Sequence, residues 1–190
     1  MPEDMIRIMG VDPALRVSGY AVIEFPAAEA STGSNVLPAS VLQGQVRIVE
    51  AGVIRVPEKP PLEERLVQIH QSLGEILDDL KPSHLAIEKL FAHYERTQPA
   101  ILMGHARGTM MLAAGQRQIP VTGYGATEIK KTVSGNGRAP KTQMQSAVCR
   151  HLGLTKVPEP HDVADALAIA LCHYFACHSV LRNLGTAKQR

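Results

Sequence analysis

The chain has 190 residues, 45% of them hydrophobic and 20% charged, which suffices for one compact domain over residues 1–190 with a sizeable core. Residues 1–4 lack the basic start and apolar middle typical of a secretion signal, no apolar segment is long enough to cross a membrane, and the three cysteines show no Cys-x-x-Cys spacing. We therefore expect a cytoplasmic protein without a membrane partner, a disulfide framework or a structural zinc site.

The formal net charge is only +2, but nine of the 20 Lys and Arg residues, and only one of the 18 acidic residues, lie between residues 96 and 156. Such a segregated basic surface suits a protein that follows phosphates, and a basic face that only keeps the protein soluble is the alternative.

A short apolar run near the N-terminus ends at the first candidate functional residue, Asp12. Residues 6–11 have the nearly continuous apolar character of a strand buried on both faces, where aspartate is disfavoured. Asp12-Pro13 is also common turn chemistry, so this stretch alone permits a turn without a function. Residues 18–25 are predicted to form a second strand, paired with the first as a hairpin.

The next segments complete a run of three strands before any long helix. Residues 26–44 are rich in Ala, Ser, Gly and Pro and are expected to form an exposed insertion. Residues 46–56 supply a third strand, broken or bulged near Gly52. A long helix follows after Pro60-Pro61, with apolar residues at steps of three and four from Leu62 to Leu80.

A second carboxylate, Glu88, lies inside the predicted fourth strand, residues 84–90. The alternative is an edge-strand glutamate that faces solvent, in which case Lys89 would point inward. Residues 91–98 form a polar connection in which Phe91 either stacks on an unpaired nucleobase or caps the core.

Small residues recur at helical spacing in the next predicted helix, from Pro99 to about Gln116. They allow close approach of another backbone, which belongs either to the sheet of the same chain or to the equivalent helix of a second subunit. A short fifth strand at 120–124 and a basic helical turn at 128–133 follow.

The last two predicted helices carry the remaining candidates. One begins at Pro140 and places Lys141 in its first turn, where the helix dipole does not favour a cation. The final helix begins near Pro160 and places Asp162 and Asp165 on one face. Asp162 is ordinary in a first turn, but burying an unpaired Asp165 among alanines and leucines would be costly unless a metal or a base compensates it. Residues 179–190 are expected to form a solvated basic end.

This order of strands and helices, with carboxylates in three separate segments, indicates an α/β fold of the ribonuclease H-like type, with a central mixed five-stranded sheet flanked by helices. The motifs closely resemble those of the bacterial RuvC Holliday-junction resolvases: Gly10-Val11-Asp12-Pro13-x-Leu15-Arg16-Val17-Ser18-Gly19-Tyr20, Ala86-Ile87-Glu88-x-x-Phe91, Gly104-x-Ala106-Arg107-Gly108, Lys130-x-Thr132-Val133-x-Gly135-x-Gly137-x-Ala139-x-Lys141 and Asp162-x-x-Asp165-Ala166-Leu167-Ala168. The resemblance extends from about residue 6 to 175 within a core of about 6–178, interrupted mainly by the insertion. Ala14 stands where the family usually has glycine and Lys89 where it commonly has glutamine, departures that bear on loop contacts and cleavage-sequence preference before catalysis.

The resemblance implies a homodimeric, magnesium-dependent endonuclease that nicks opposed strands of four-way DNA junctions in recombination and repair, beside a branch-migration motor. It implies two Mg²⁺ ions per active site, which Mn²⁺ can replace, and two divalent cations do suit phosphodiester hydrolysis. The implied metal ligands, which are also the catalytic carboxylates, are Asp12, Glu88, Asp162 and Asp165. Lys141 is expected to act in catalysis, and the expected DNA contacts are Phe91, Arg107, Lys130, Lys131, Arg138 and Lys141.

Three alternatives differ from this interpretation. A nuclease of the same fold could act on RNA, or the chain could bind junctions with degenerate metal sites and cut nothing. The actin-like ATPases share the first hairpin pattern, but 190 residues provide only about one of their two domains.

Overall fold

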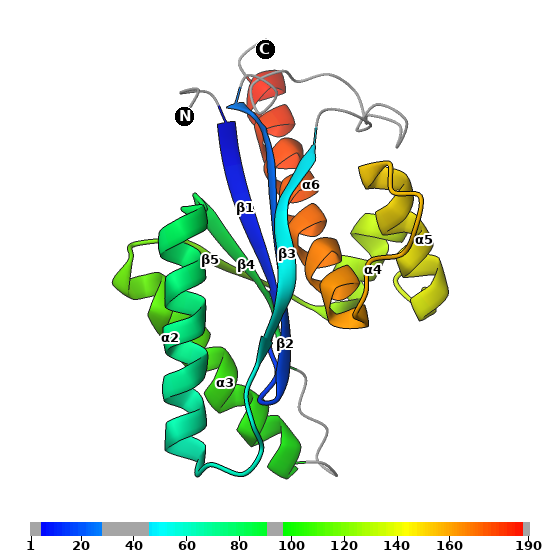
Figure 1. Ribbon diagram of the computed structural model, residues 1–190. Helices are drawn as coiled ribbons and strands as arrows, with labels where there is room; N and C mark the ends of the chain where they lie inside the picture. Colours follow the sequence, from blue (N-terminus) through cyan, green and yellow to red (C-terminus); the bar gives the residue numbers. More distant parts are fainter. Residues whose placement is uncertain (1–4, 28–45, 91–96, 188–190) are drawn as a thin grey trace.

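A mixed five-stranded sheet with the strand order β3-β2-β1-β4-β5 forms the centre of the computed structural model, which describes residues 5–27, 46–90 and 97–187 (Figure 1). The first three strands pair antiparallel, and β4 and β5 run parallel to β1. The strands are β1 (Met5–Asp12), β2 (Val17–Pro26), β3 (Arg47–Arg55), β4 (His84–Glu88) and β5 (Val121–Tyr124).

Helices cover both faces of this sheet (Figure 1). On one face lie α2 (Leu62–Leu80) and α3 (Thr97–Gln116), which begins two residues before the predicted Pro99. On the other face lies α6 (His161–Ala187), with α4 (Ala126–Ser134) and α5 (Lys141–Leu152) packed beside it. The arrangement confirms the predicted α/β fold with a mixed five-stranded sheet flanked by helices.

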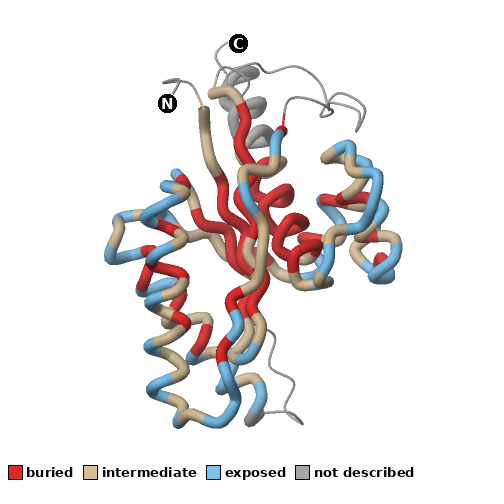
Figure 2. Tube along the Cα trace, viewed as in Figure 1, coloured by how far each residue is buried: buried red, intermediate tan, exposed pale blue. Residues whose placement is uncertain are grey.

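Alternating side chains of β1 belong to two hydrophobic cores. Ile8 packs in the core that α6 covers, whereas Met9 and Val11 pack in the core under α2 and α3, and all three are fully buried. A strand covered on both faces is nearly continuously apolar because successive side chains point to opposite faces. Figure 2 shows burial concentrated in the central strands and in the part of α6 that crosses them.

The predicted bulge in the third strand is present, but it lies three residues before Gly52. The pairing of β3 with β2 shifts between Glu50 and Ile48, so the extra residue is Val49. Gly52 pairs with Tyr20, whose hydroxyl would lie 2.9 Å from a Cβ at position 52. The glycine therefore makes room for an aromatic ring rather than breaking the strand.

The edge-strand interpretation of Glu88 was wrong. Strand β4 lies between β1 and β5, and Glu88 is its last residue rather than an interior one. Glu88 is half-buried, while Lys89 is exposed and does not point inward.

The chain ends differ from the prediction in one respect. Helix α6 continues to Ala187, so most of the predicted solvated end, residues 179–190, has a helical backbone. The predicted insertion, residues 26–44, lies outside the described residues except for Pro26 and Ala27. Among the helices that the structure describes, none combines the length and apolar character needed to cross a membrane.

Candidate active site

Parallel pairing of β1 with β4 brings Asp12 and Glu88 together where the C-terminal ends of these two inner strands meet, which is called this edge of the sheet below. The register pairs Val11 with Ile87, and each acidic residue follows directly as the last residue of its strand. Neighbouring strands lie about 4.8 Å apart, so the two carboxylates leave the sheet close together.

The first turn of α6 reaches this edge because two strand glycines admit the helix backbone. A Cβ at Gly10 would overlap the carbonyl oxygen of Ala166, and a Cβ at Gly19 would overlap the carbonyl oxygen of Asp162. Gly19 is also the residue that pairs with Asp12 across the hairpin. The close approach places the acidic turn of α6 beside the end of β1.

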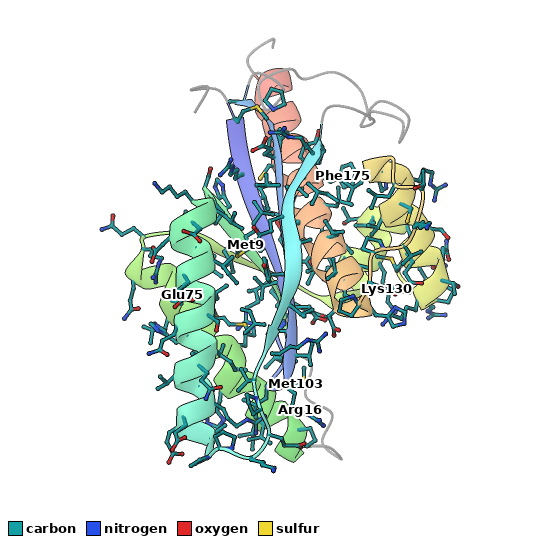
Figure 3. All side chains as sticks on the ribbon, in the orientation of Figure 1. Met9, Arg16, Glu75, Met103, Lys130 and Phe175 are labelled. Carbon is teal, nitrogen blue, oxygen red and sulfur yellow. The ribbon has the colours of Figure 1, made fainter. Side chains whose placement is uncertain are left out.

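Three of the predicted carboxylates and one predicted lysine line a single cavity of about 280 Å³. They are Asp12, Glu88, Asp165 and Lys130. A larger cavity of about 540 Å³ adjoins it, since Asp12 and Glu88 line both, and it extends along α3 to Met103. Met103 and Lys130, labelled in Figure 3, come from helices on the two sides of this end of the sheet.

Burial and neighbouring carboxylates raise the pKa values of Asp12 and Glu88. Burial is the largest cause of the raised pKa of Asp12, which is about 7. The negative charges of Glu88, Asp165 and Asp162 raise it as well, in that order, while Lys141 lowers it. The pKa of Glu88 is raised by burial and then by Asp165. Asp162 lines neither cavity, but its negative charge contributes to the raised pKa of Asp12.

Helices α5 and α6 are joined by two polar contacts beside the cavity. Lys141 Nζ lies 3.4 Å from Asp165 Oδ2, and Gln145 Nε2 lies 3.1 Å from His161 Nδ1. The side chains of Lys141 and Asp165 are 53% and 41% exposed, so this ion pair contributes little to stability and is easily exchanged for another partner.

Among the described residues, the predicted DNA contacts Lys131, Arg138 and Arg107 do not line either cavity. Lys131 and Arg138 are exposed and line neither of the two cavities. Arg107 is half-buried, and its Nε donates a 2.9 Å hydrogen bond to the backbone carbonyl of Glu88. Phe91 lies outside the described residues.

The donor set of the cavity suits a hard divalent cation. Magnesium prefers oxygen ligands, and carboxylates supply them. Burial is the largest cause of the pKa of about 7 at Asp12, and the neighbouring carboxylates raise it further although Lys141 opposes them. Within the described residues, no group of three or more His, Cys, Asp or Glu side chains is already arranged to hold a metal ion. The chemistry of the residues therefore fits such a cation, while their side-chain positions do not by themselves define its place.

A polar clamp on the loop after β1 was missed in the sequence. Ser18 Oγ accepts a 3.0 Å hydrogen bond from the N–H of Ala14 and donates a 2.6 Å hydrogen bond to its carbonyl. Ala14 does not have a positive φ, so alanine replaces the usual glycine there without backbone strain. A serine four residues after a strand-ending turn was the available signal, because serine hydroxyls often bond to nearby backbone groups.

Sequence comparison finds similar proteins over almost the whole chain. Residues 8–173 match the family model described as crossover junction endodeoxyribonuclease RuvC. The RuvC protein of Rhodopirellula baltica is 47% identical over 176 residues, which cover 92% of this chain and 90% of that protein. The RuvC protein of Corynebacterium efficiens is 40% identical over 189 residues, covering 98% of this chain and 77% of that protein.

Solved structures with the same architecture include a resolvase bound to DNA. Thermus thermophilus RuvC in complex with Holliday junction substrate is similar with a TM-score of 0.78 and 30% identity, covering 93% of this chain and 97% of that chain. The yeast mitochondrial Holliday junction resolvase Ydc2 is similar with a TM-score of 0.58 and covers 94% of this chain and 84% of that chain. At 11% identity, the second likeness concerns the fold alone.

Proposed function

The chain belongs to the RuvC family of crossover junction endodeoxyribonucleases, and from this membership we propose that it resolves four-way DNA junctions by paired symmetric nicks in recombination and DNA repair. The observation that supports this best is the cavity in which Asp12, Glu88 and Asp165 meet Lys130. Gathering like charges at a half-buried place opposes folding, so such a cluster has a functional rather than a structural use.

We assign four carboxylates as the holders of two divalent cations, Mg²⁺ or, in its place, Mn²⁺. They are Asp12, Glu88, Asp162 and Asp165. Cations bound there would activate a water and would stabilise the leaving oxygen of the phosphodiester. The chain itself holds its strand-borne ligands rigidly, because Asp12 and Glu88 are the last residues of two paired strands.

Two lysines are assigned to the scissile phosphate. Lys130 lines the cavity, and Lys141 forms an exposed ion pair with Asp165, which lines it too. A phosphate entering the site offers Lys141 a stronger partner, and a cation positioned there offsets charge that develops in the transition state. The exposed Lys131 and Arg138 are assigned to phosphates farther along the DNA, and Phe91 to a nucleobase.

A homodimer is part of the proposal because two symmetric nicks need two active sites related by a twofold axis. We assign the contact surface between the two subunits to helix α3. Its Ala106, Met110, Ala113 and Ala114 are buried in the core shared with α2, while other apolar side chains of the helix remain exposed. The exposed side chains are Ile101, Leu102, Met103, Met111 and Leu112. Leu112→Glu, at a side chain that is 56% exposed in this chain, is expected to give a folded monomer by sedimentation equilibrium.

The remaining elements of the proposal concern context. One nuclease domain spans residues 1–190, and it acts in the cytoplasm, where bacterial DNA lies. A branch-migration motor that moves the junction is the proposed partner complex. Co-sedimentation with such a motor on junction DNA would test this partnership.

The decisive experiment compares matched DNA substrates in Mg²⁺. The wild-type chain is expected to cut a mobile four-way junction at symmetric positions in opposed strands, and to leave linear duplex and RNA–DNA hybrid nearly intact. Asp165→Asn is expected to bind the junction and not cut it. Preferential cleavage of the hybrid would favour a ribonuclease, and an Asp165→Asn variant indistinguishable from wild type would favour a junction-binding protein without catalysis.

A further inference from the structure

Both polar groups of the peptide bond that joins Glu88 to Lys89, the C=O and the N–H, form hydrogen bonds. The N–H of Lys89 donates a 2.8 Å hydrogen bond to the carbonyl of Tyr124 at the end of β5. The carbonyl of Glu88 accepts a 2.9 Å hydrogen bond from Nε of Arg107 on α3. The backbone at the catalytic end of β4 therefore cannot rotate without losing one of these bonds.

A side chain holds the Glu88 carbonyl because the neighbouring strand has ended. Strand β1 stops at Asp12, and Pro13, the next residue, has no N–H to donate. The N–H of Ala14 is already used by Ser18 Oγ. Arg107 thus takes the place of a strand donor, and without it a half-buried carbonyl would lose its partner.

Gly123 of β5 leaves the space in which the Arg107 guanidinium lies. A Cβ at this position would lie 3.1 Å from Arg107 Nη2 and 3.1 Å from Lys89 Cγ. Both distances are tighter than ordinary contact, so a side chain here would press on the guanidinium and on the residue that follows Glu88. The glycine and the arginine form one packing unit behind the catalytic carboxylate.

We propose that Arg107 is a positioning residue for Glu88 rather than a contact to DNA. It fixes the Glu88–Lys89 peptide and thereby the direction in which the carboxylate enters the cavity. It also joins the active site to α3, the helix assigned above to the dimer. This role rests on the proposed nuclease function, and it assigns the half-buried guanidinium to the protein's own backbone rather than to a phosphate.

Three variants separate a positioning role from a DNA contact. Arg107→Met removes the donors, Arg107→Lys keeps the charge and one donor group, and Gly123→Ala keeps the arginine but crowds it. Two quantities are measured for each variant: junction affinity in EDTA as a function of salt, and the single-turnover cleavage rate in Mg²⁺ at saturating protein. Lys131→Gln serves as the reference for a lost phosphate contact, which is expected to reduce the salt slope by about one.

Arg107→Met and Gly123→Ala are expected to slow cleavage by about 10- to 100-fold, the range for a small misplacement of a catalytic group, with wild-type affinity and salt slope. Arg107→Lys should slow cleavage less than Arg107→Met does. The double variant Arg107→Met/Gly123→Ala should be no slower than the slower single variant, because both changes disturb one contact.

Two outcomes would overturn the proposal. The first is a salt slope reduced by about one with an unchanged saturated rate in Arg107→Met, which is the signature of a phosphate contact. The second is a wild-type cleavage rate in Gly123→Ala, which also decides the matter if Arg107→Met fails to fold by circular dichroism. Failure of the wild-type chain to cut junctions would count against the proposed function. If the wild-type chain cuts junctions and both Arg107→Met and Gly123→Ala cut them at the wild-type rate, only the positioning role is contradicted.

Discussion

Gly19 controls how closely the acidic turn of α6 approaches Asp12, and Gly19→Ala tests this directly. The added Cβ would overlap the backbone carbonyl of Asp162 and lie 3.1 Å from the Cβ of the same residue. A backbone atom cannot rotate aside as a flexible side chain can. Either the start of α6 or the end of the β1–β2 hairpin must therefore move.

The size of the effect follows from this overlap. A Cβ at position 19 would overlap the Asp162 carbonyl oxygen so far that restoring ordinary contact requires a shift of roughly 1.5 Å. Overpacking of this kind lowers the free energy of unfolding by about 1–3 kcal/mol, which corresponds to a Tm decrease of roughly 2–12 °C at this chain length. A displacement of about 1 Å between catalytic groups can also slow a reaction by about 100-fold, or about 2.7 kcal/mol in the barrier.

Urea unfolding in EDTA and single-turnover junction cleavage in Mg²⁺ measure the two effects separately. Gly115→Ala is the matched control, because nothing lies within 4 Å of a Cβ at that exposed position of α3. It is expected to leave cleavage unchanged and to raise stability by about 0.5–1 kcal/mol. A Gly19→Ala protein with the stability and cleavage rate of wild type would refute the idea that this glycine sets the distance between α6 and β1.

Three further changes test the charges of the structure. Lys141→Gln is expected to slow cleavage by about 100- to 1,000-fold. The free energy of unfolding should change by less than about 1 kcal/mol, because the ion pair of Lys141 is exposed. A cleavage rate within threefold of wild type in the junction assay would contradict the role of Lys141. Glu24 is 2% exposed and accepts hydrogen bonds from Arg7 Nε and Arg47 Nε at 3.0 and 2.9 Å, so Glu24→Gln should lower the urea-derived free energy of unfolding by about 2–3 kcal/mol, and a loss below about 0.5 would contradict this. Burial and the charge of His84 lower the pKa of His173 from 6.5 to about 4. The unfolded chain therefore takes up this proton first as the pH falls, and stability should decrease by up to about 3 kcal/mol between pH 6.5 and 4. Chemical unfolding across this range should show a shallower decrease in His173→Gln, and equal slopes would refute the assignment.

Hydrophobic periodicity was sufficient to predict most of the fold. Helix α2 begins at Leu62 and ends at Leu80 as predicted, because its apolar stripe and its flanking prolines are both local signals. The bulge was misplaced because a glycine in a strand has two meanings, a break or a close approach. Only the pairing of Gly52 with Tyr20, which depends on the register of β2 and β3, distinguishes them.

Asp12, Glu88 and Asp165 were visible in the sequence because each is locally out of place, whereas Asp162 is ordinary in a first turn and was indicated only by the family resemblance. Aspartate after an apolar strand or among alanines is a local anomaly that any reader of the sequence can see. The strand order that puts Asp12 beside Glu88 is a property of the whole chain. The hydrogen bond from Arg107 to the Glu88 carbonyl joins a side chain to a backbone group 19 residues away, and no residue pattern signals such a contact.

The direction of α6 explains how the fold tolerates four carboxylates in one place. The N-terminus of a helix carries a partial positive charge, and α6 brings this end to the edge where β1 and β4 finish. Asp162 lies in the first turn, where that charge is favourable, but Asp165 lies one turn later and depends more on Lys141, 3.4 Å away. The compensation is incomplete, because burial and then the charges of the other three carboxylates raise the pKa of Asp12 to about 7, and Lys141 opposes them only in part. The charge that remains uncompensated is the part that a divalent cation would neutralise, so the arrangement that weakens the fold without a metal is the one that favours binding it.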